Sequence, residues 1–91
     1  MSHFKLAFMP FPDEFKPGTG YTLKKNDDLF LILIDSSQDE ELQKLTLRHE
    51  LAHISLNHFD KPFHEEMEIE AEAKALTMTE EEFANLMQYA I

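Results

Sequence analysis

The chain has 91 residues, no cysteine and a formal net charge of −10, which fits one small domain over residues 1–91 with a single modest core. The lack of cysteine excludes a disulfide scaffold and thiolate metal ligands, and the negative charge argues against a nucleic-acid partner. There is no apolar run long enough to span a membrane and no secretory signal at the N-terminus, so we expect a cytoplasmic protein.

The first third of the chain predicts a small β-sheet. Residues 3–11 are rich in aromatic side chains and alternate imperfectly, which indicates a strand or an extended arm. Prolines and glycines interrupt residues 12–20, where we expect a loop. Residues 21–25 and 29–35 read as a hairpin with the polar turn 26–28. Because its second strand is almost entirely apolar, we expect that strand in the middle of the sheet or covered on both faces.

A long helix is predicted over residues 38–57. Ser37 and Glu40 have the spacing of a capping box, which favours a helix start at this point. At 100° per residue, the side chains of interest fall on two faces. One face holds Leu42, Leu45, His49, Ala52, His53 and Leu56, and the other holds Leu47, Leu51 and Ile54. A helix with two such faces is expected between layers of the fold.

Two further helices are predicted towards the C-terminus. Residues 65–77 contain good helix formers and no breaker. The apolar stripe expected to face inward consists of Ile69, Ala73 and Leu76. Thr79 and Glu82 form a capping box that starts a short terminal helix. The fold class is therefore α+β, with a small antiparallel sheet of N-terminal strands packed on the first helix and two more helices after it.

The first helix carries His49, Glu50 and His53 in the arrangement H-E-x-x-H. Two histidines four residues apart lie on the same side of a helix, so both imidazoles can reach one cation. Glu50 lies beside the pair, where it can take a proton from a water at the metal. The composition of the chain alone would produce roughly 0.03 accidental matches to this motif. The arrangement is typical of zinc peptidases.

A catalytic zinc usually takes three protein ligands and keeps one position for water. His58 stands one position away from the third histidine of the longer zincin pattern, so we expect a glutamate of the second helix instead. Glu70 is our choice, because it lies mid-helix at the margin of the expected inward stripe and is followed by the small Ala71. Glu66 and Glu68 remain alternatives. Such a site would hold one zinc ion per chain, and manganese suits the same donors.

Around these residues the chain resembles the metallopeptidases of the ImmA/IrrE type, whose small members are encoded in phages and other mobile elements. The resemblance spans about residues 21–91. Its specific parts are the H-E-x-x-H helix, residues 46–56, and the segment 68–75, which is similar to the family pattern E-x-E-A-(N/D)-x-F-A. Two residues depart from that pattern: Glu72 replaces the usual Asn or Asp, and Lys74 replaces an aromatic residue.

The resemblance implies a small zincin-like α+β domain with zinc at His49, His53 and the glutamate matching Glu70, and with Glu50 as general base. It also implies a protein substrate, typically a helix-turn-helix transcriptional repressor of the same phage or mobile element. Direct binding of nucleic acid or of a membrane is not expected.

Two other functions compete with the peptidase. One is a non-catalytic zincin-like module that binds a regulatory protein without cutting it. The other is a three-histidine zinc hydrolase acting on RNA. That second alternative is disfavoured because His58 has the wrong spacing for it and because the negative charge repels RNA.

The H-E-x-x-H motif says less about the residues that would surround and support the metal site. The histidines outside the motif, His3, His58 and His64, are expected to be ordinary surface residues. Candidates for stabilising the oxyanion are Tyr21, His58 and His64. Glu72 or Asp35 is expected to orient the metal-binding imidazoles.

Overall fold

The computed structural model describes residues 2–15 and 18–91 and shows three strands followed by three α-helices. The strands are β1 (His3–Met9), β2 (Gly20–Asn26) and β3 (Leu29–Asp35), and the helices are α1 (Glu40–Ser55), α2 (Glu66–Thr77) and α3 (Glu80–Met87). This arrangement confirms the α+β fold class. The expected loop over 12–20 includes one turn of 3-10 helix at Asp13–Phe15, and its residues 16–17 lie outside the described part of the chain.

The sheet has the strand order β1-β3-β2, so the apolar strand β3 is central, as predicted. β2 pairs with β3 antiparallel through the expected hairpin, whereas β1 pairs with the other edge of β3 in parallel. The sheet is therefore mixed, and the prediction of a purely antiparallel sheet was wrong. A hairpin turn specifies an antiparallel neighbour, but apolar alternation does not specify the direction of a strand that arrives through a long connection.

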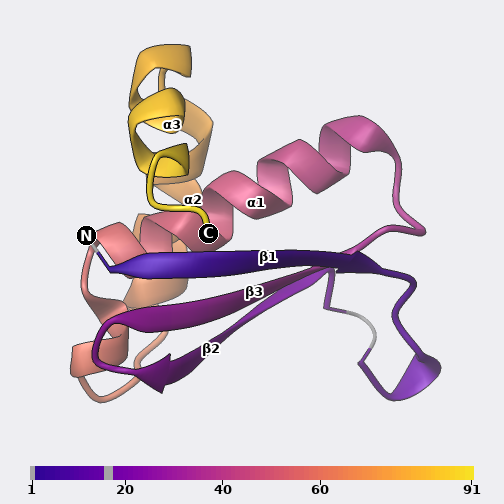
Figure 1. The fold of residues 1–91 in the computed structure, drawn as a ribbon, viewed down its shortest axis with the longest axis horizontal. Coiled ribbons are helices and arrows are strands. Elements are labelled where there is room, and N and C mark those ends of the chain that lie inside the picture. Colours follow the sequence, from indigo (N-terminus) through magenta and orange to yellow (C-terminus); the bar gives the residue numbers. More distant parts are fainter. Residues whose placement is uncertain (1, 16–17) are drawn as a thin grey trace.

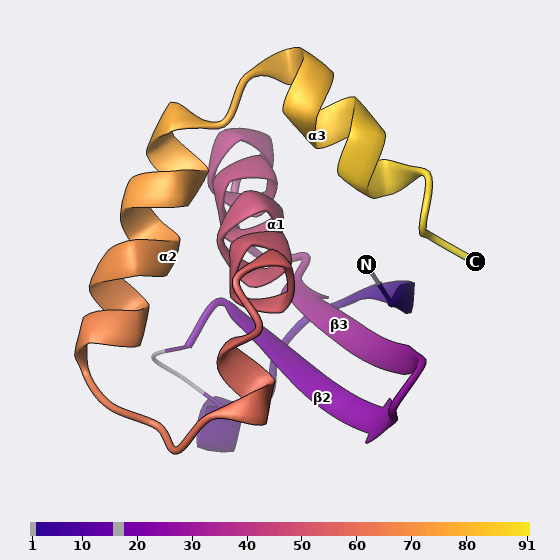
Figure 2. The ribbon, with the colours of Figure 1, turned by 90° about the vertical axis from the view of Figure 1, so that its left-hand side faces the viewer.

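Helix α1 lies across one face of the sheet (Figure 1). Figure 2, which looks nearly along α1, shows α2 on one side of this helix and α3 on the other. The main core lies between sheet and helix and consists of Phe4, Phe30, Ile32, Ile34, Leu47, Leu51 and Ile54. The second face of α1 also contains buried residues, Ala52 and His53 among them. This confirms the prediction of a helix buried on two sides.

The N-terminus of α1 differs from its prediction. Asp39 is the N-cap, because its carboxylate accepts a hydrogen bond of 2.8 Å from the backbone N–H of Leu42. Ser37 does not cap the helix. Its hydroxyl donates instead to Asp35 at 2.7 Å. The buried carboxylate of Asp35 competes for the serine, which moves the helix start to Glu40.

Asp35 ends β3 and is fully buried. Its carboxylate accepts hydrogen bonds from the backbone N–H of Phe11 and from the N–H and hydroxyl of Ser37, and it also accepts one from the side-chain amide of Gln38. These bonds, led by that of the Ser37 hydroxyl, hold the pKa of Asp35 well below its usual value. The carboxylate therefore ties the segment after β1 to the segment before α1.

We predict that Asp35→Asn lowers the melting temperature at neutral pH by several degrees, because the amide accepts fewer of these bonds and adds a buried donor. A carboxyl with a depressed folded-state pKa stabilises the fold above its unfolded pKa of about 3.9 and loses that contribution as the pH falls further. Thermal melts followed by circular dichroism should therefore show the gap between wild type and Asn variant closing in acid. A gap that stays constant down to about pH 3 would contradict this role.

Helix α2 is rotated relative to its prediction. Its buried residues are Met67, Ala71 and Ala75, whereas Ile69 and Leu76 are 69% and 65% exposed. The expected inward stripe was thus wrong, because a helical wheel shows which residues share a side of a helix but not which side packs against its neighbours. The buried side of α2 carries Met67 and the small Ala71 and Ala75, and small side chains let α2 pack closely against α1. This rotation determines which of the α2 glutamates face α1.

The third helix begins as predicted. Thr79 and Glu82 form a capping box, with the backbone N–H of Glu82 donating to the Thr79 hydroxyl at 3.0 Å. Lys74, which replaces an aromatic residue of the family pattern, contacts Glu82 at 3.2 Å and so links α2 to α3. Among the described residues, no helix combines the length and apolar character needed to cross a bilayer.

Candidate metal centre

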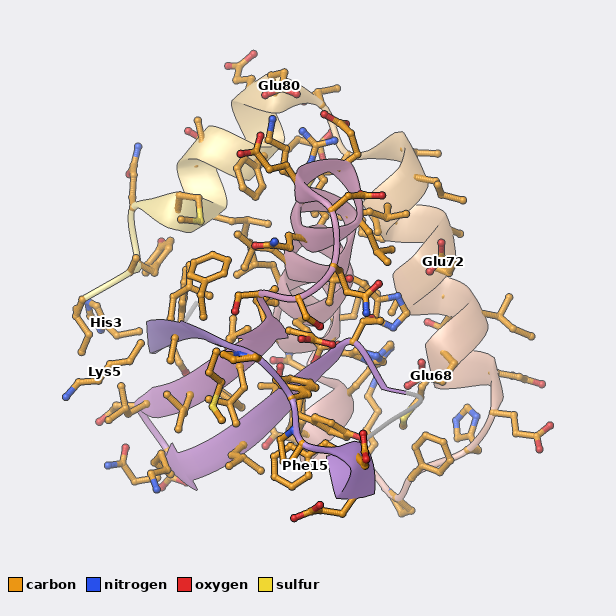
Figure 3. The ribbon with its side chains drawn as sticks, turned by 90° about the vertical axis from the view of Figure 1, so that its right-hand side faces the viewer. His3, Lys5, Phe15, Glu68, Glu72 and Glu80 are labelled. Atoms are coloured by element: carbon orange, nitrogen blue, oxygen red, sulfur yellow. The ribbon has the colours of Figure 1, made fainter. Side chains whose placement is uncertain are left out.

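The two motif histidines face α2 and lie close together. The Nε2 atoms of His49 and His53 are 3.1 Å apart. Glu68 of α2 reaches both rings, with one carboxylate oxygen 3.1 Å from His49 Nε2 and the other 3.1 Å from His53 Nε2. Figure 3 shows Glu68 and Glu72 one turn apart along the side of α2 that faces α1. The structure therefore gathers two imidazoles and one carboxylate at one point.

This donor set fits a zinc ion. In a tetrahedral site with bonds of about 2.0–2.1 Å, neighbouring donor atoms are about 3.3 Å apart. The Nε2 atoms of His49 and His53 are 3.1 Å apart, and each lies 3.1 Å from one of the two Glu68 carboxylate oxygens, which is close to that spacing. Two histidines and one glutamate are also the protein ligands of a well-known class of catalytic zinc sites. Burial lowers the pKa of His53, which favours the neutral imidazole that a metal ion requires.

The glutamates of α2 are not placed as the sequence suggested. Glu70, the predicted third ligand, lies beside His58 instead, with its Oε2 atom 3.7 Å from His58 Nε2. Glu66 lies in the first turn of α2 and is exposed. Glu68 is one of the two alternatives that the sequence leaves open. Because Met67 and Ala71 form the buried side of α2, Glu68 is turned towards the two motif histidines.

Glu72 supports the first histidine. Its carboxylate accepts a hydrogen bond of 3.0 Å from His49 Nδ1–H. Since Glu72 follows Glu68 by four residues, both carboxylates project from the same side of α2. A carboxylate on the second nitrogen of a metal-binding histidine fixes its tautomer and orientation. Of the two carboxylates expected to orient the imidazoles, Glu72 therefore contacts a motif histidine, whereas Asp35 binds groups at the end of β3.

Glu50 lies beside the histidine pair and is only 8% exposed. One of its oxygens accepts a hydrogen bond of 2.7 Å from the hydroxyl of Thr22 on β2. Burial raises the pKa of Glu50, and the bond from Thr22 partly opposes that rise. A Cβ at Gly20 would lie 2.5 Å from a methyl carbon of Thr46, so glycine allows the start of β2 to approach α1 closely beside this carboxylate.

His58, expected on the surface, is buried. It is 6% exposed, and its Nδ1 lies 2.8 Å from Nδ1 of His53. The chain turns back after α1 through Asn57, which has a left-handed backbone with φ of 57°. The only signal in the sequence was an asparagine directly after the helix, a residue that tolerates this conformation. Apolar periodicity alone could not have identified His58.

The donor atoms line a cleft of about 800 Å³ between α1, α2 and the start of β2. This volume is within the range of ligand-binding pockets. Its lining includes Gly20, Tyr21, Thr22, His49, Glu50, His53, Phe59, Phe63, Met67, Glu68 and Glu72. The Tyr21 hydroxyl donates to the carbonyl of Phe15 at 2.7 Å. His3 and His64 are exposed, as expected.

Comparison with known proteins adds one match. The sequence model of the IrrE N-terminal-like domain, which describes a peptidase family, matches residues 5–91. Searches of curated proteins and of solved structures returned no match. The matched segment contains β2, β3 and all three helices, and therefore every residue of the candidate metal centre.

Proposed function

The chain belongs to the family of IrrE N-terminal-like domains, and on that premise we propose that it is a zinc-dependent endopeptidase. The observation that carries the proposal is the convergence of His49, His53 and Glu68 beside Glu50 in an open cleft. Membership of a peptidase family makes a metallopeptidase the expected activity. The arrangement of these four residues supports that activity.

His49, His53 and Glu68 would hold one zinc ion, or a manganese ion, through two nitrogens and a carboxylate oxygen. When bound, the ion lowers the pKa of a coordinated water and polarises the carbonyl of the substrate. The Glu72 carboxylate accepts a hydrogen bond from Nδ1–H of His49, which leaves Nε2 of His49 free as a ligand. The choice of Glu68 over Glu70 rests on the contacts of α2.

Glu50 is the general base of the proposed reaction. It takes a proton from the attacking water while the water oxygen forms a bond to the peptide carbonyl carbon. It then gives the proton to the leaving nitrogen as the C–N bond breaks. Thr22 holds one carboxylate oxygen of Glu50, so the other oxygen remains available for the proton.

The proposed substrate is a basic segment of a regulatory protein in the cytoplasm, such as a helix-turn-helix repressor of the same phage or mobile element. The net charge of −10 favours encounter with a basic partner. β3 alone among the described strands pairs with β2, so β2 has an edge beside the cleft to which an extended peptide can add.

Removal of the metal should stop the activity. We predict that the zinc-loaded protein cuts a helix-turn-helix protein encoded beside it at discrete bonds. Cleavage should cease with 1,10-phenanthroline and return on addition of zinc, because the water is activated only with the ion in place. Mass spectrometry of the fragments gives the measurement. Cleavage that persists in the chelator would contradict the proposal, and so would stable binding of the partner without cleavage by the zinc-loaded protein.

A further inference from the structure

His58 occupies an unusual position for a residue that follows the motif helix. Its side chain is 4% exposed, and its ring lies 5.0 Å from the ring of His53 between centroids, at an interplanar angle of 65°. The two Nδ1 atoms face each other at 2.8 Å. Only one hydrogen can lie between two nitrogens at this distance, so one imidazole donates and the other accepts.

The direction of this bond follows from the metal centre. His53 faces Glu68 and His49 through Nε2, so Nε2 is the nitrogen available to an ion. A neutral imidazole that binds a metal through Nε2 carries its hydrogen on Nδ1. His53 Nδ1–H therefore donates, and Nδ1 of His58 accepts. This places the remaining hydrogen of His58 on its Nε2.

The second nitrogen of His58 supports the same tautomer. His58 Nε2 is buried and has no hydrogen-bond partner among the described residues. A carboxylate oxygen of Glu70 lies 3.7 Å away, just beyond hydrogen-bond length. A small side-chain movement would let Nε2–H donate to Glu70, which gives this glutamate a function other than metal binding.

We infer that His58 is a positioning residue for the metal centre: it accepts the Nδ1–H of His53 and so holds the Nε2 of that ligand towards the ion. The inference rests on the proposed function. The two ligand imidazoles are then oriented by different groups, since His49 donates to the carboxylate of Glu72 and His53 donates to a neutral imidazole held near Glu70.

The test is the zinc dissociation constant, measured by competition with a chelating dye. His58→Phe keeps an aromatic ring but removes the acceptor, and it should weaken zinc binding about 10- to 100-fold, the usual effect of losing such a partner. His58→Asn should restore most of the affinity, because its amide oxygen can take the place of Nδ1. Equal affinity of wild type and Phe variant, or an Asn variant as weak as the Phe variant, would overturn the inference.

A second readout needs no variant. In zinc-loaded wild type labelled with ¹⁵N-histidine, Nδ1 of His53 should be protonated and Nδ1 of His58 unprotonated. The opposite pattern would overturn the inference, even if His58→Phe fails to fold. If wild type binds no zinc at all, both the proposed function and the inference fall. If wild type binds zinc and His58→Phe binds it equally well, only the inference falls.

Discussion

Replacing Glu50 with glutamine will lower the rate of peptide hydrolysis by several orders of magnitude and leave zinc binding intact. Glutamine keeps the shape of the side chain and can still accept the bond from Thr22, but it cannot take a proton from the attacking water. Loss of a general base costs about 10²- to 10⁴-fold in rate. The rate of substrate cleavage and the zinc content of the same preparation are the two measurements.

Two further variants serve as comparisons for Glu50→Gln. Glu81→Gln removes an exposed carboxylate of α3 and should leave the rate unchanged. Thr22→Val removes only the hydroxyl that holds Glu50, so its loss of rate should be smaller than that of Glu50→Gln. Full activity of Glu50→Gln would refute the assigned role. If Glu50→Gln no longer cuts the substrate but keeps the biological effect of the wild type, the non-catalytic binding module is favoured.

Replacing Glu68 with glutamine will remove most of the zinc affinity. The carboxylate contacts both ligand imidazoles at 3.1 Å, and an amide is a much weaker zinc ligand. Loss of a supporting hydrogen bond costs about 10- to 100-fold in metal affinity, so loss of a direct ligand should cost more than about 100-fold. Chelator competition on the purified variant measures the change.

Glu70→Gln is the matched comparison, because it changes the same group on the same helix two residues away. It should retain most of the zinc affinity, since Glu70 faces His58. The reverse order, with zinc lost from Glu70→Gln and kept by Glu68→Gln, would restore the ligand assignment made from the sequence and refute the one made from the structure.

The elements of the fold were largely readable from the sequence. The hairpin of β2 and β3, the central place of β3 and the capping box at Thr79 follow from local patterns, and the structure confirms each of them. The spacing of His49 and His53 likewise predicted that both rings could reach a common point, and their Nε2 atoms lie 3.1 Å apart. Local sequence specifies these features because neighbours along the chain produce them.

Features that depend on packing between elements were not readable in this way. The rotation of α2 about its own axis is determined by how Ala71 and Ala75 fit against the rest of the fold, not by the size of Ile69. Glu68 therefore contacts the two motif histidines, where the sequence predicted Glu70, and Glu70 lies beside His58 instead. His58 was missed because a single left-handed residue, Asn57, turns the chain and buries the ring.

The most direct test of the metal centre is a crystal of the zinc-loaded protein measured above and below the zinc absorption edge. We predict one anomalous peak per chain, about 2.0–2.2 Å from the Nε2 atoms of His49 and His53 and from one oxygen of Glu68. A peak coordinated by other residues, or no peak between these side chains, would contradict the metal site on which the proposed peptidase activity depends.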